Sequence, residues 1–255
     1  MIQLMNNEVY ILKKLAQDSG DVCLLSALEG HMGKVWIDCN KTPQLGFIVV
    51  ADFCYILGKC KGREDEQSIS NLLEYAKGKL IKIEDPKWVQ VIQSYSPERF
   101  KRFNRYSTKR EATRFDIDLL GVYIRRVEEN FEIKRIDAQM FEKILVNPFM
   151  ADLCCFFSSI EDYMTNGFGY IIEHENEIVA GASSYSFCEG MIDITIGCVT
   201  EYRGKGLAKA VASKVILESL EKKIYPVWDA VDQRSIALAN RLGYEYDQEY
   251  EVYMI

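Results

Sequence analysis

Residues 191–221 constrain the fold of this chain more than any other segment. In Met191–Val199, isoleucines alternate with polar residues and glycine, which is typical of a strand with one apolar and one polar face. A loop with two glycines follows at 200–206, and Leu207–Glu221 then has the spacing of an amphipathic helix. A strand, a glycine-containing turn and a long helix in direct succession predict an α/β unit.

The loop that joins this strand to this helix has the chemistry of an anion site. Gly204 and Gly206 lack a Cβ atom, so the backbone can turn tightly and approach a ligand closely. The first amides of the helix have no internal acceptors and lie at the positive end of its dipole. The residues expected to bind a phosphate here are Arg203, Gly204, Lys205, Gly206, Leu207 and Ala208.

Two other phosphate-binding motifs fit the loop less well. A dinucleotide motif, GxGxxG, needs a third glycine where this chain has Lys209, and it follows a continuously apolar strand without the four residues that intervene here. Asp229 does stand near the place of the acidic residue of that motif. A P-loop needs Gly-Lys followed by Ser or Thr, which the loop lacks.

The remainder of 131–255 continues the α/β pattern. Asp137 is the expected N-cap of a helix that runs towards Val146, and Asp232 that of a helix Ser235–Leu242 that Gly243 terminates. The further strands are expected at 131–136, 168–173, 177–184, 225–231 and 249–254. The predicted order is β-α-β-β-β-α-β-α-β, a mixed α/β fold.

Residues 1–130 are expected to form a separate α/β domain without a cofactor loop, followed by a second domain at 131–255. Their order of strands and helices suggests a degenerate copy of the second domain. The predicted helices are 8–17, 68–77, one opened by Pro86, and 119–129, and the predicted strands are 34–38, 45–57, 80–83 and, as a strand or loop, 103–114.

Composition limits the functions that the chain can have. The net charge is −7, and residues 131–255 hold 11 Lys and Arg against 20 Asp and Glu, a net −9. This balance argues against nucleic acid as a partner and favours a cationic one, although a surface that merely keeps the protein soluble is the alternative explanation.

The eight cysteines include no CxxC pair and only two histidines accompany them, so we expect buried, reduced thiols and no metal site. Because no apolar run approaches the roughly 20 residues that span a bilayer, and no signal-peptide pattern opens the chain, we expect a cytoplasmic protein with no membrane contact.

Two motifs together resemble the GNAT superfamily of N-acetyltransferases. The first is ITIGCVTEYRGKGLA from Ile194, in which RGKGLA stands for the family's Q/R-x-x-G-x-G/A, and the second is SIALANRLGY from Ser235. This resemblance covers roughly 131–255. The dipeptide Trp228-Asp229 and the Gly-Tyr ending further resemble the subgroup around zwittermicin A resistance acetyltransferases.

The resemblance implies a GNAT fold, acetyl-CoA as co-substrate, a small-molecule amine as acceptor, and no covalent enzyme intermediate. Backbone groups of Cys198, Val199 and Thr200 would extend the sheet onto the pantetheine arm, and an amide near Val199 would meet the thioester oxygen. Asp193 is the candidate base, with Glu173 and Glu189 as weaker rivals and a solvated strand carboxylate as the alternative role. A homo-oligomer is left open.

The chain departs from the family at the last helix. Asp232 and Ser235 are expected in the cofactor site, but Asp232 replaces the usual asparagine, and Ala239 stands where many members have the tyrosine that returns a proton to the CoA thiolate. Tyr244 and Ser235 lie near in sequence. An active N-acetyltransferase is therefore one hypothesis, and a CoA-binding regulatory module with reduced activity is the other.

Overall fold

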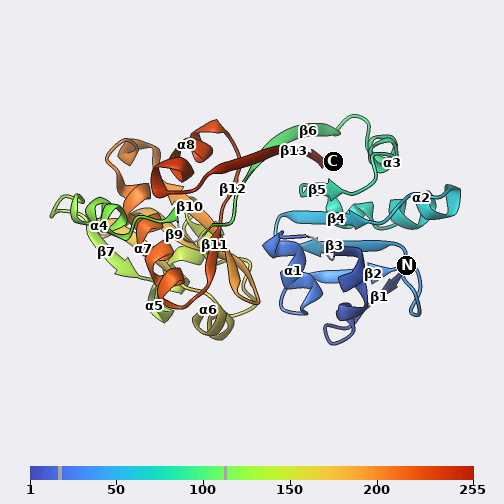
Figure 1. Cartoon of the computed structure of the whole chain (residues 1–255), viewed down its shortest axis with the longest axis horizontal. Helices are drawn as coiled ribbons and strands as arrows, with labels where there is room; N and C mark the ends of the chain where they lie inside the picture. Colours follow the sequence, from blue (N-terminus) through green and yellow to red (C-terminus); the bar gives the residue numbers. More distant parts are fainter. Residues whose placement is uncertain (17–18, 112–113) are drawn as a thin grey trace. The chain divides into compact units, whose positions relative to one another are not determined.

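A computed structural model describes residues 1–16, 19–111 and 114–255. The chain divides into two compact units: unit 1 is Met1–Arg105 with Glu249–Ile255, and unit 2 is Tyr106–Gln248. This boundary precedes the one expected at residue 130. The reason is that helix α4 (Ile117–Arg125) packs along helix α7 (Leu207–Glu221), so it belongs to the second unit (Figure 1).

Unit 1 is built on a sheet with the order β1-β2-β3-β4-β5, in which only β4 and β5 are parallel. The large aromatic and aliphatic side chains of its core include Trp88, Phe47 and Ile56, all fully buried. The strands are β1 (Ile2–Gln3), β2 (Lys34–Ile37), β3 (Gly46–Val50), β4 (Phe53–Leu57), β5 (Leu80–Ile83) and β6 (Lys101–Thr108).

The helices of unit 1 differ from those expected: α1 is not predicted, and the single helix expected at 68–77 is wrong, because α2 ends at Ser70 and η2 is a separate turn. They are η1 (Val9–Ala16, a 3₁₀-helix), α1 (Val22–Leu28), α2 (Arg63–Ser70), η2 (Leu73–Ala76, also 3₁₀) and α3 (Trp88–Tyr95). Residue 17, the expected end of the first helix, and residues 112–113 of the expected strand or loop 103–114 lie outside the described residues.

The single strand expected at 45–57 is wrong: this stretch is a hairpin. Ala51 adopts a left-handed backbone with φ of 49°, and the chain reverses there between β3 and β4. A continuous apolar run concealed this turn, because both strands of the hairpin are buried and no glycine or proline marks it.

Unit 2 has a sheet with the order β7-β8-β9-β10-β11, in which only β10 and β11 are parallel. The strands of this part of the chain are β7 (Glu132–Arg135), β8 (Gly169–His174), β9 (Glu177–Cys188), β10 (Met191–Cys198), β11 (Tyr225–Val227), β12 (Asp229–Ala230) and β13 (Tyr246–Met254). The mixed α/β fold expected from the sequence is confirmed.

Helices cover both faces of this second sheet. The remaining helices are α5 (Ala138–Leu145), η4 (Ala151–Leu153, 3₁₀), α6 (Ile160–Asn166), η5 (Thr200–Tyr202, 3₁₀) and α8 (Gln233–Leu242). Helix α7 packs on β8, β9, β10 and β11, and α4 covers α7 from outside, so α7 is buried on more sides than an amphipathic surface helix would be. The opposite face receives η4, because Leu153 and Met150 lie against Gly181 and Gly197.

The two units have the same topology. In each, a run of antiparallel strands ends in a strand that is joined to a parallel neighbour through a helical crossover, α2 with η2 in unit 1 and α7 in unit 2. The sequence-based idea of a second copy of the fold is supported by this correspondence.

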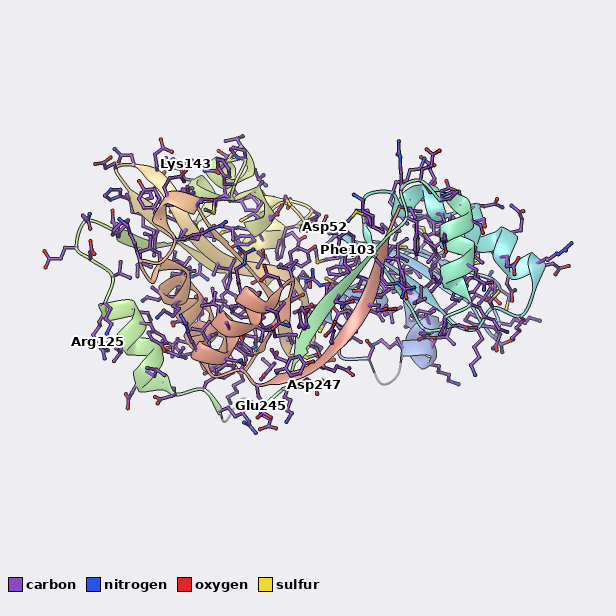
Figure 2. All side chains as sticks on the ribbon, turned by 90° about the horizontal axis from the view of Figure 1, so that it is seen from above. Asp52, Phe103, Arg125, Lys143, Glu245 and Asp247 are labelled. Atoms are coloured by element: carbon purple, nitrogen blue, oxygen red, sulfur yellow. The ribbon has the colours of Figure 1, made fainter. Side chains whose placement is uncertain are left out.

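The strands β6 and β13 belong to both units, because each unit boundary falls inside one of them. They are neighbours in the sheet, and their two ribbons run side by side in Figure 2. Within unit 2, the Ser107 hydroxyl donates to the Asp247 carboxylate.

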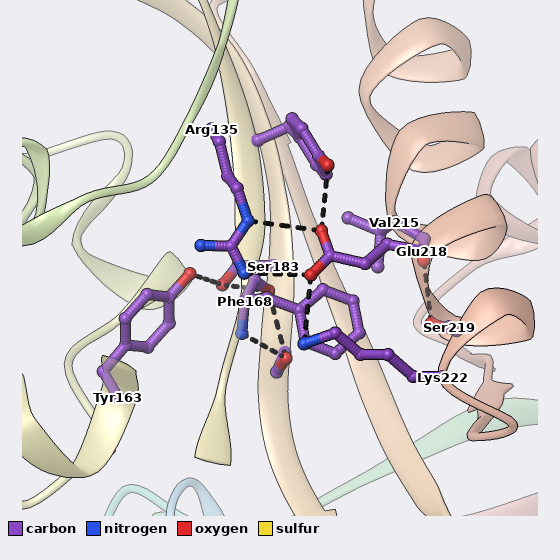
Figure 3. A network of polar contacts seen from close by, with 10 residues as sticks. Arg135, Tyr163, Phe168, Ser183, Val215, Glu218, Ser219 and Lys222 are labelled. Carbon is purple, nitrogen blue, oxygen red and sulfur yellow. Dashed lines mark hydrogen bonds and ion pairs between the residues drawn. The ribbon is translucent and has the colours of Figure 1, made fainter. Parts of the chain in front are cut away.

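Helix α7 is fixed to the sheet of unit 2 by a polar network centred on Glu218 (Figure 3). Its carboxylate accepts from Arg135 Nη2 at 2.9 Å, from the Tyr170 hydroxyl at 2.8 Å and from Lys222 Nζ at 3.1 Å. The side chain of Glu218 is only 12% exposed. Donors from β7 and β8 therefore hold the C-terminal half of the helix to the sheet, and Lys222, the C-cap of α7, adds a local ion pair.

Five of the eight cysteines are buried, namely Cys23, Cys54, Cys60, Cys154 and Cys188. Among the described residues, no helix is long and apolar enough to cross a membrane, and no group of three or more His, Cys, Asp or Glu side chains is placed to hold a metal ion.

Candidate active site

The loop before α7 leaves a run of backbone amides without partners. Gly204 and Gly206 have φ values of 84° and 86°, in the left-handed region that glycine adopts without strain. Gly206 is the N-cap of α7 and has no side chain to bond the first turn. The amides of residues 204–209 have no acceptor within the described residues. These amides lie in the loop that the sequence predicts as an anion site, and they extend into the first turn, Leu207 to Lys209.

The amide and the side chain of Arg203 both donate to carbonyl groups of the preceding residues. Its N–H donates to the Thr200 carbonyl at 3.2 Å, and its Nε donates to the Cys198 carbonyl at 3.2 Å. Because the 3₁₀ turn of η5 uses the amide, Arg203 closes the loop from within and only the outer edge of its guanidinium remains for a ligand. In this structure the Arg203 amide therefore has an acceptor within the protein, unlike the amides of residues 204–209.

The edge of β10 towards α7 is open for most of its length. Strand β11 pairs with β10 only from Met191 to Asp193. Beyond that point β10 has no strand partner on this edge within the described residues, while its other edge pairs with β9 up to Cys198. In an antiparallel pair alternate residues point their N–H and C=O groups away from the partner. Ile194, Ile196 and Cys198 therefore present backbone groups to the open edge.

The Val199 amide also has a partner within the protein, here through strand pairing. Its amide donates to the Val179 carbonyl on β9 at 2.9 Å, and its carbonyl accepts from Tyr202 at 3.0 Å. Alternation along β10 assigns Val199 to the β9 side, so the amides that face the open edge are those of Ile196 and Cys198. Thr200 lies just beyond, exposed, at the start of η5.

Lys205 lies over an aromatic group formed by Phe131, His174 and Tyr202. Its Nζ is 5.4 Å from the ring centroid of Phe131 and 5.6 Å from that of Tyr202. Phe131 stacks on His174 with 4.5 Å between centroids. No carboxylate pairs with Lys205 within the described residues. Its ammonium is held near the glycine loop by rings, which leaves its charge available to an anion.

Asp193 lies on the face of β10 opposite to α7, and it is half-buried. Its charge is near the phenol of Tyr244, whose pKa is raised well above its ordinary value by burial first and by the charges of Tyr225 and Asp193 after that. Of its two rivals, Glu173 is buried and paired with Lys134, and Glu189 is exposed.

The start of α8 is a closed local network. Asp232 is the N-cap, as predicted: its Oδ1 accepts from the Ser235 amide at 2.9 Å, and its Oδ2 accepts from Arg234 Nη2 at 2.8 Å. The Ser235 hydroxyl accepts from Trp228 Nε1 at 3.1 Å. The Arg234 guanidinium offsets the Asp232 charge.

Among the described residues, no phenol hydroxyl is free at the position where many family members have a tyrosine or at the nearest tyrosine in sequence, Tyr244. Ala239 is fully buried on α8. Tyr244, the nearest phenol in sequence, is also buried and donates its hydroxyl to the Pro226 carbonyl at 2.8 Å. Its hydroxyl is therefore committed to the backbone of β11.

In the corresponding loop of unit 1, residues 58–62 between β4 and α2, backbone amides bond carboxylates of the same unit. The Gly58 amide donates to Glu84 Oε2 at 2.8 Å and the Cys60 amide donates to Asp85 Oδ2 at 3.0 Å. Carboxylates of unit 1 thus bond two backbone amides of this loop.

Comparisons with known proteins place the chain in a family. The family model described as GNAT acetyltransferase matches residues 13–253, and the chain belongs to that family. The match extends through unit 1, beyond the region 131–255 in which the sequence motifs lie. Members of this family generally use acetyl-CoA.

Solved structures agree with this assignment. A GCN5-related N-acetyltransferase-like protein from Streptococcus suis is 31% identical, with 98% of this chain and 99% of that chain covered and a TM-score of 0.87. A tandem GNAT protein from the clavulanic acid biosynthesis pathway is 12% identical, with 98% and 94% covered and a TM-score of 0.60, which shows similarity of fold alone.

Among curated proteins, the uncharacterized N-acetyltransferase YdfB of Bacillus subtilis is 34% identical over 100 residues. This match covers 38% of this chain and 38% of that protein, so the chain spans well under half of the length of this relative.

Proposed function

We propose that the chain is an acetyl-CoA-dependent N-acetyltransferase that transfers acetyl directly to the amine of a small molecule. Within the family, Trp228-Asp229 and the Gly-Tyr ending of α8 support the subgroup that resembles zwittermicin A resistance acetyltransferases. The acidic balance of residues 131–255 supports a cationic acceptor. We place the enzyme in the cytoplasm.

The observation that carries the proposal is the run of unpartnered amides at residues 204–209 next to the open edge of β10. The amides are suited to a diphosphate, and the edge is suited to an extended ligand with amide groups, because such a ligand can pair with it as a strand would. The pantetheine arm of CoA has that chemistry. Lys205 adds a cation beside the loop.

Asp193 is the proposed base. It precedes Cys198 by five residues, roughly 16 Å along the strand, so it can serve a thioester only if the arm lies along β10. The amine nitrogen bonds to the acetyl carbon as the C–S bond breaks, and CoA leaves as a thiolate. One proton passes from the ammonium to Asp193, directly or through water, and the thiolate takes up another. In this proposal the amide of Ile196 or of Cys198 donates to the thioester oxygen.

The cofactor site is tested by the double variant Gly204→Asp/Gly206→Asp. Each carboxylate adds negative charge and a Cβ to the cradle, so acetyl-CoA affinity measured by isothermal titration should fall at least a hundredfold. The matched control is Gly78→Asp/Gly190→Asp. Both of those glycines also have positive φ and open space around a Cβ, but they lie elsewhere in the chain.

If the control loses affinity as well, backbone strain and not the site explains the effect. If wild type does not bind acetyl-CoA, or if the loop variant binds it as well as wild type, the assignment of the site is wrong.

Asp193→Asn tests the base separately. It should reduce acetyl transfer about 10²–10⁴-fold, with the loss smaller at high pH, and leave acetyl-CoA affinity unchanged. Glu189→Gln on the adjoining turn is the control and should keep full activity. Equal activity of Asp193→Asn and wild type would exclude this role.

The alternative function is a CoA-binding regulatory module with little turnover, which the buried Ala239 and the engaged Tyr244 hydroxyl favour. Release of thiol from acetyl-CoA, followed with a panel of polyamines, aminoglycosides and amino acids, separates the two. Amine-dependent release supports the enzyme, and tight binding with no release for any amine supports the module.

A further inference from the structure

Lys209 is the second lysine near the glycine loop, and it is held on the other side of α7 from the sheet. Its Nζ lies 4.4 Å from the ring centroid of Tyr123 on α4. The Tyr123 hydroxyl donates to the Arg241 carbonyl in the last turn of α8 at 3.1 Å. The ring is therefore fixed between two helices, and it fixes the ammonium in turn.

The charge of Lys209 is not neutralised by the protein. No carboxylate pairs with Lys209 within the described residues, whereas Lys134 and Lys222 of the same unit each pair with a glutamate. Residues 131–255 carry a net negative charge, so an ammonium without a carboxylate partner stands out there. Lys209 lies over a ring in the first turn of a helix, and this position is suited to an anionic ligand. Lys209 also carries one of the unpartnered amides of the cradle.

The ring of Tyr123 comes from α4, which precedes residues 131–255, where the family motifs lie. Tyr123 stands near the end of α4, and Phe131, under Lys205, stands where the chain enters β7. Arg125, labelled in Figure 2, and Arg126 lie between them, exposed, at the end of the same helix. The end of α4 and the chain that follows it therefore supply the rings that lie near Lys209 and Lys205.

We propose that Lys209, positioned by Tyr123, binds the phosphate on the 3′ position of the CoA ribose. The inference rests on the proposed function. The diphosphate takes the amides around the helix axis, and Lys209 lies off that axis on the α4 side, where a second phosphate of the same ligand can reach it. A phosphate monoester carries nearly two negative charges at pH 7, so a single ammonium discriminates strongly for it.

The test compares CoA with dephospho-CoA, which lacks only this phosphate, by titration of the full chain at fixed ionic strength. Wild type should bind CoA roughly tenfold more tightly than dephospho-CoA. Lys209→Met should remove that preference by weakening CoA alone. Lys214→Met is the matched control, because Lys214 also lies on α7 over a ring, that of Tyr170, but further from the loop. Tyr123→Leu should reduce the preference less than Lys209→Met does.

Each outcome decides one question. Equal weakening of both ligands by Lys209→Met, an unchanged preference in that variant, or the same loss in Lys214→Met would overturn the role of Lys209 while leaving the cofactor site intact. Absence of any preference in wild type would do the same. Failure of wild type to bind either ligand would instead refute the proposed function.

Discussion

Replacement of Glu218 by glutamine should loosen the attachment of α7 to its sheet. The wild-type carboxylate bonds to Arg135, Tyr170 and Lys222, which come from three different elements. Glutamine keeps the size of the side chain and one acceptor oxygen, but it loses the charge and offers an NH₂ group to two cations. The change therefore isolates the electrostatic part of the network.

The expected cost lies between those of a surface and a buried ion pair. Glu218 is 12% exposed, but its partners Arg135 and Lys222 are 43% and 45% exposed and regain water when the pair is lost. A surface pair contributes about 0–1 kcal/mol, and breaking a buried one costs about 3–5 kcal/mol. We expect Glu218→Gln to lower the free energy of unfolding by about 1–3 kcal/mol near pH 7.

The pH dependence gives the sharper test. Burial alone raises the pKa of Glu218, but the hydrogen bonds from Arg135, Tyr170 and Lys222 outweigh it, and the pKa is lowered in the folded state. A lowered pKa stabilises the fold fully above the unfolded value of about 4.3, and this contribution is lost as the pH falls through the folded value. The difference between wild type and variant should therefore shrink below about pH 4.

Urea denaturation followed by circular dichroism from pH 3 to pH 7 measures this difference, with Glu221→Gln as control on the same helix. Glu221 is exposed and has no ion pair within the described residues, so its replacement should change stability by less than about 0.5 kcal/mol. A loss for Glu218→Gln that is the same at pH 3 as at pH 7 would refute the electrostatic reasoning, and so would a loss matched by the control.

Two further outcomes follow from unit 1. Because its carboxylates occupy the amides of the loop 58–62, titration of the full chain with acetyl-CoA should give one site per chain, and a second site of comparable affinity would contradict this. Lys82→Met removes the cation that bonds Asp21 Oδ2 at 2.6 Å, so it should lower the free energy of unfolding by about 1–3 kcal/mol, less at acid pH because the pKa of Asp21 is lowered. Denaturation of this variant beside the exposed Lys59→Met measures the loss, and equal stability of the two would show that the pair contributes little.

The parts of the fold that local chemistry determines could be predicted from the sequence. The helix Leu207–Glu221 and the strand Leu80–Ile83 have the predicted bounds, and Asp137 and Asp232 cap the predicted helices. In each case the signal is contained in a short window, as a periodic apolar pattern or as a side chain that bonds amides two or three residues later.

The parts that depend on distant residues could not be predicted. Helix α6, Ile160–Asn166, is not predicted from the sequence, because seven residues carry too little of a periodic pattern. Its N-cap Ser159 is the one local signal for it. The engagement of the Val199 amide depends on the register between β9 and β10, which no local pattern of residues 198–200 encodes. For the candidate site, the glycine loop could be located from the sequence, but the ring of Tyr123 could not, because it comes from a helix about 85 residues earlier that was assigned to the other domain.

The two copies of the fold show why a loop alone does not define a cofactor site. Both units have a loop between a strand and the helix that follows it. In each unit this loop and helix connect two parallel strands, β4 and β5 in unit 1 and β10 and β11 in unit 2. In unit 1, Glu84 and Asp85 follow β5, 22 or more residues after the loop ends, and their carboxylates bond its amides. In unit 2, the chain after β11 and β12 supplies Asp232 to cap α8 instead, and the amides before α7 stay open. We infer that the carboxylates of Glu84 and Asp85 keep the unit 1 loop from accepting a phosphate, whereas the amides before α7 have no acceptor within the described residues.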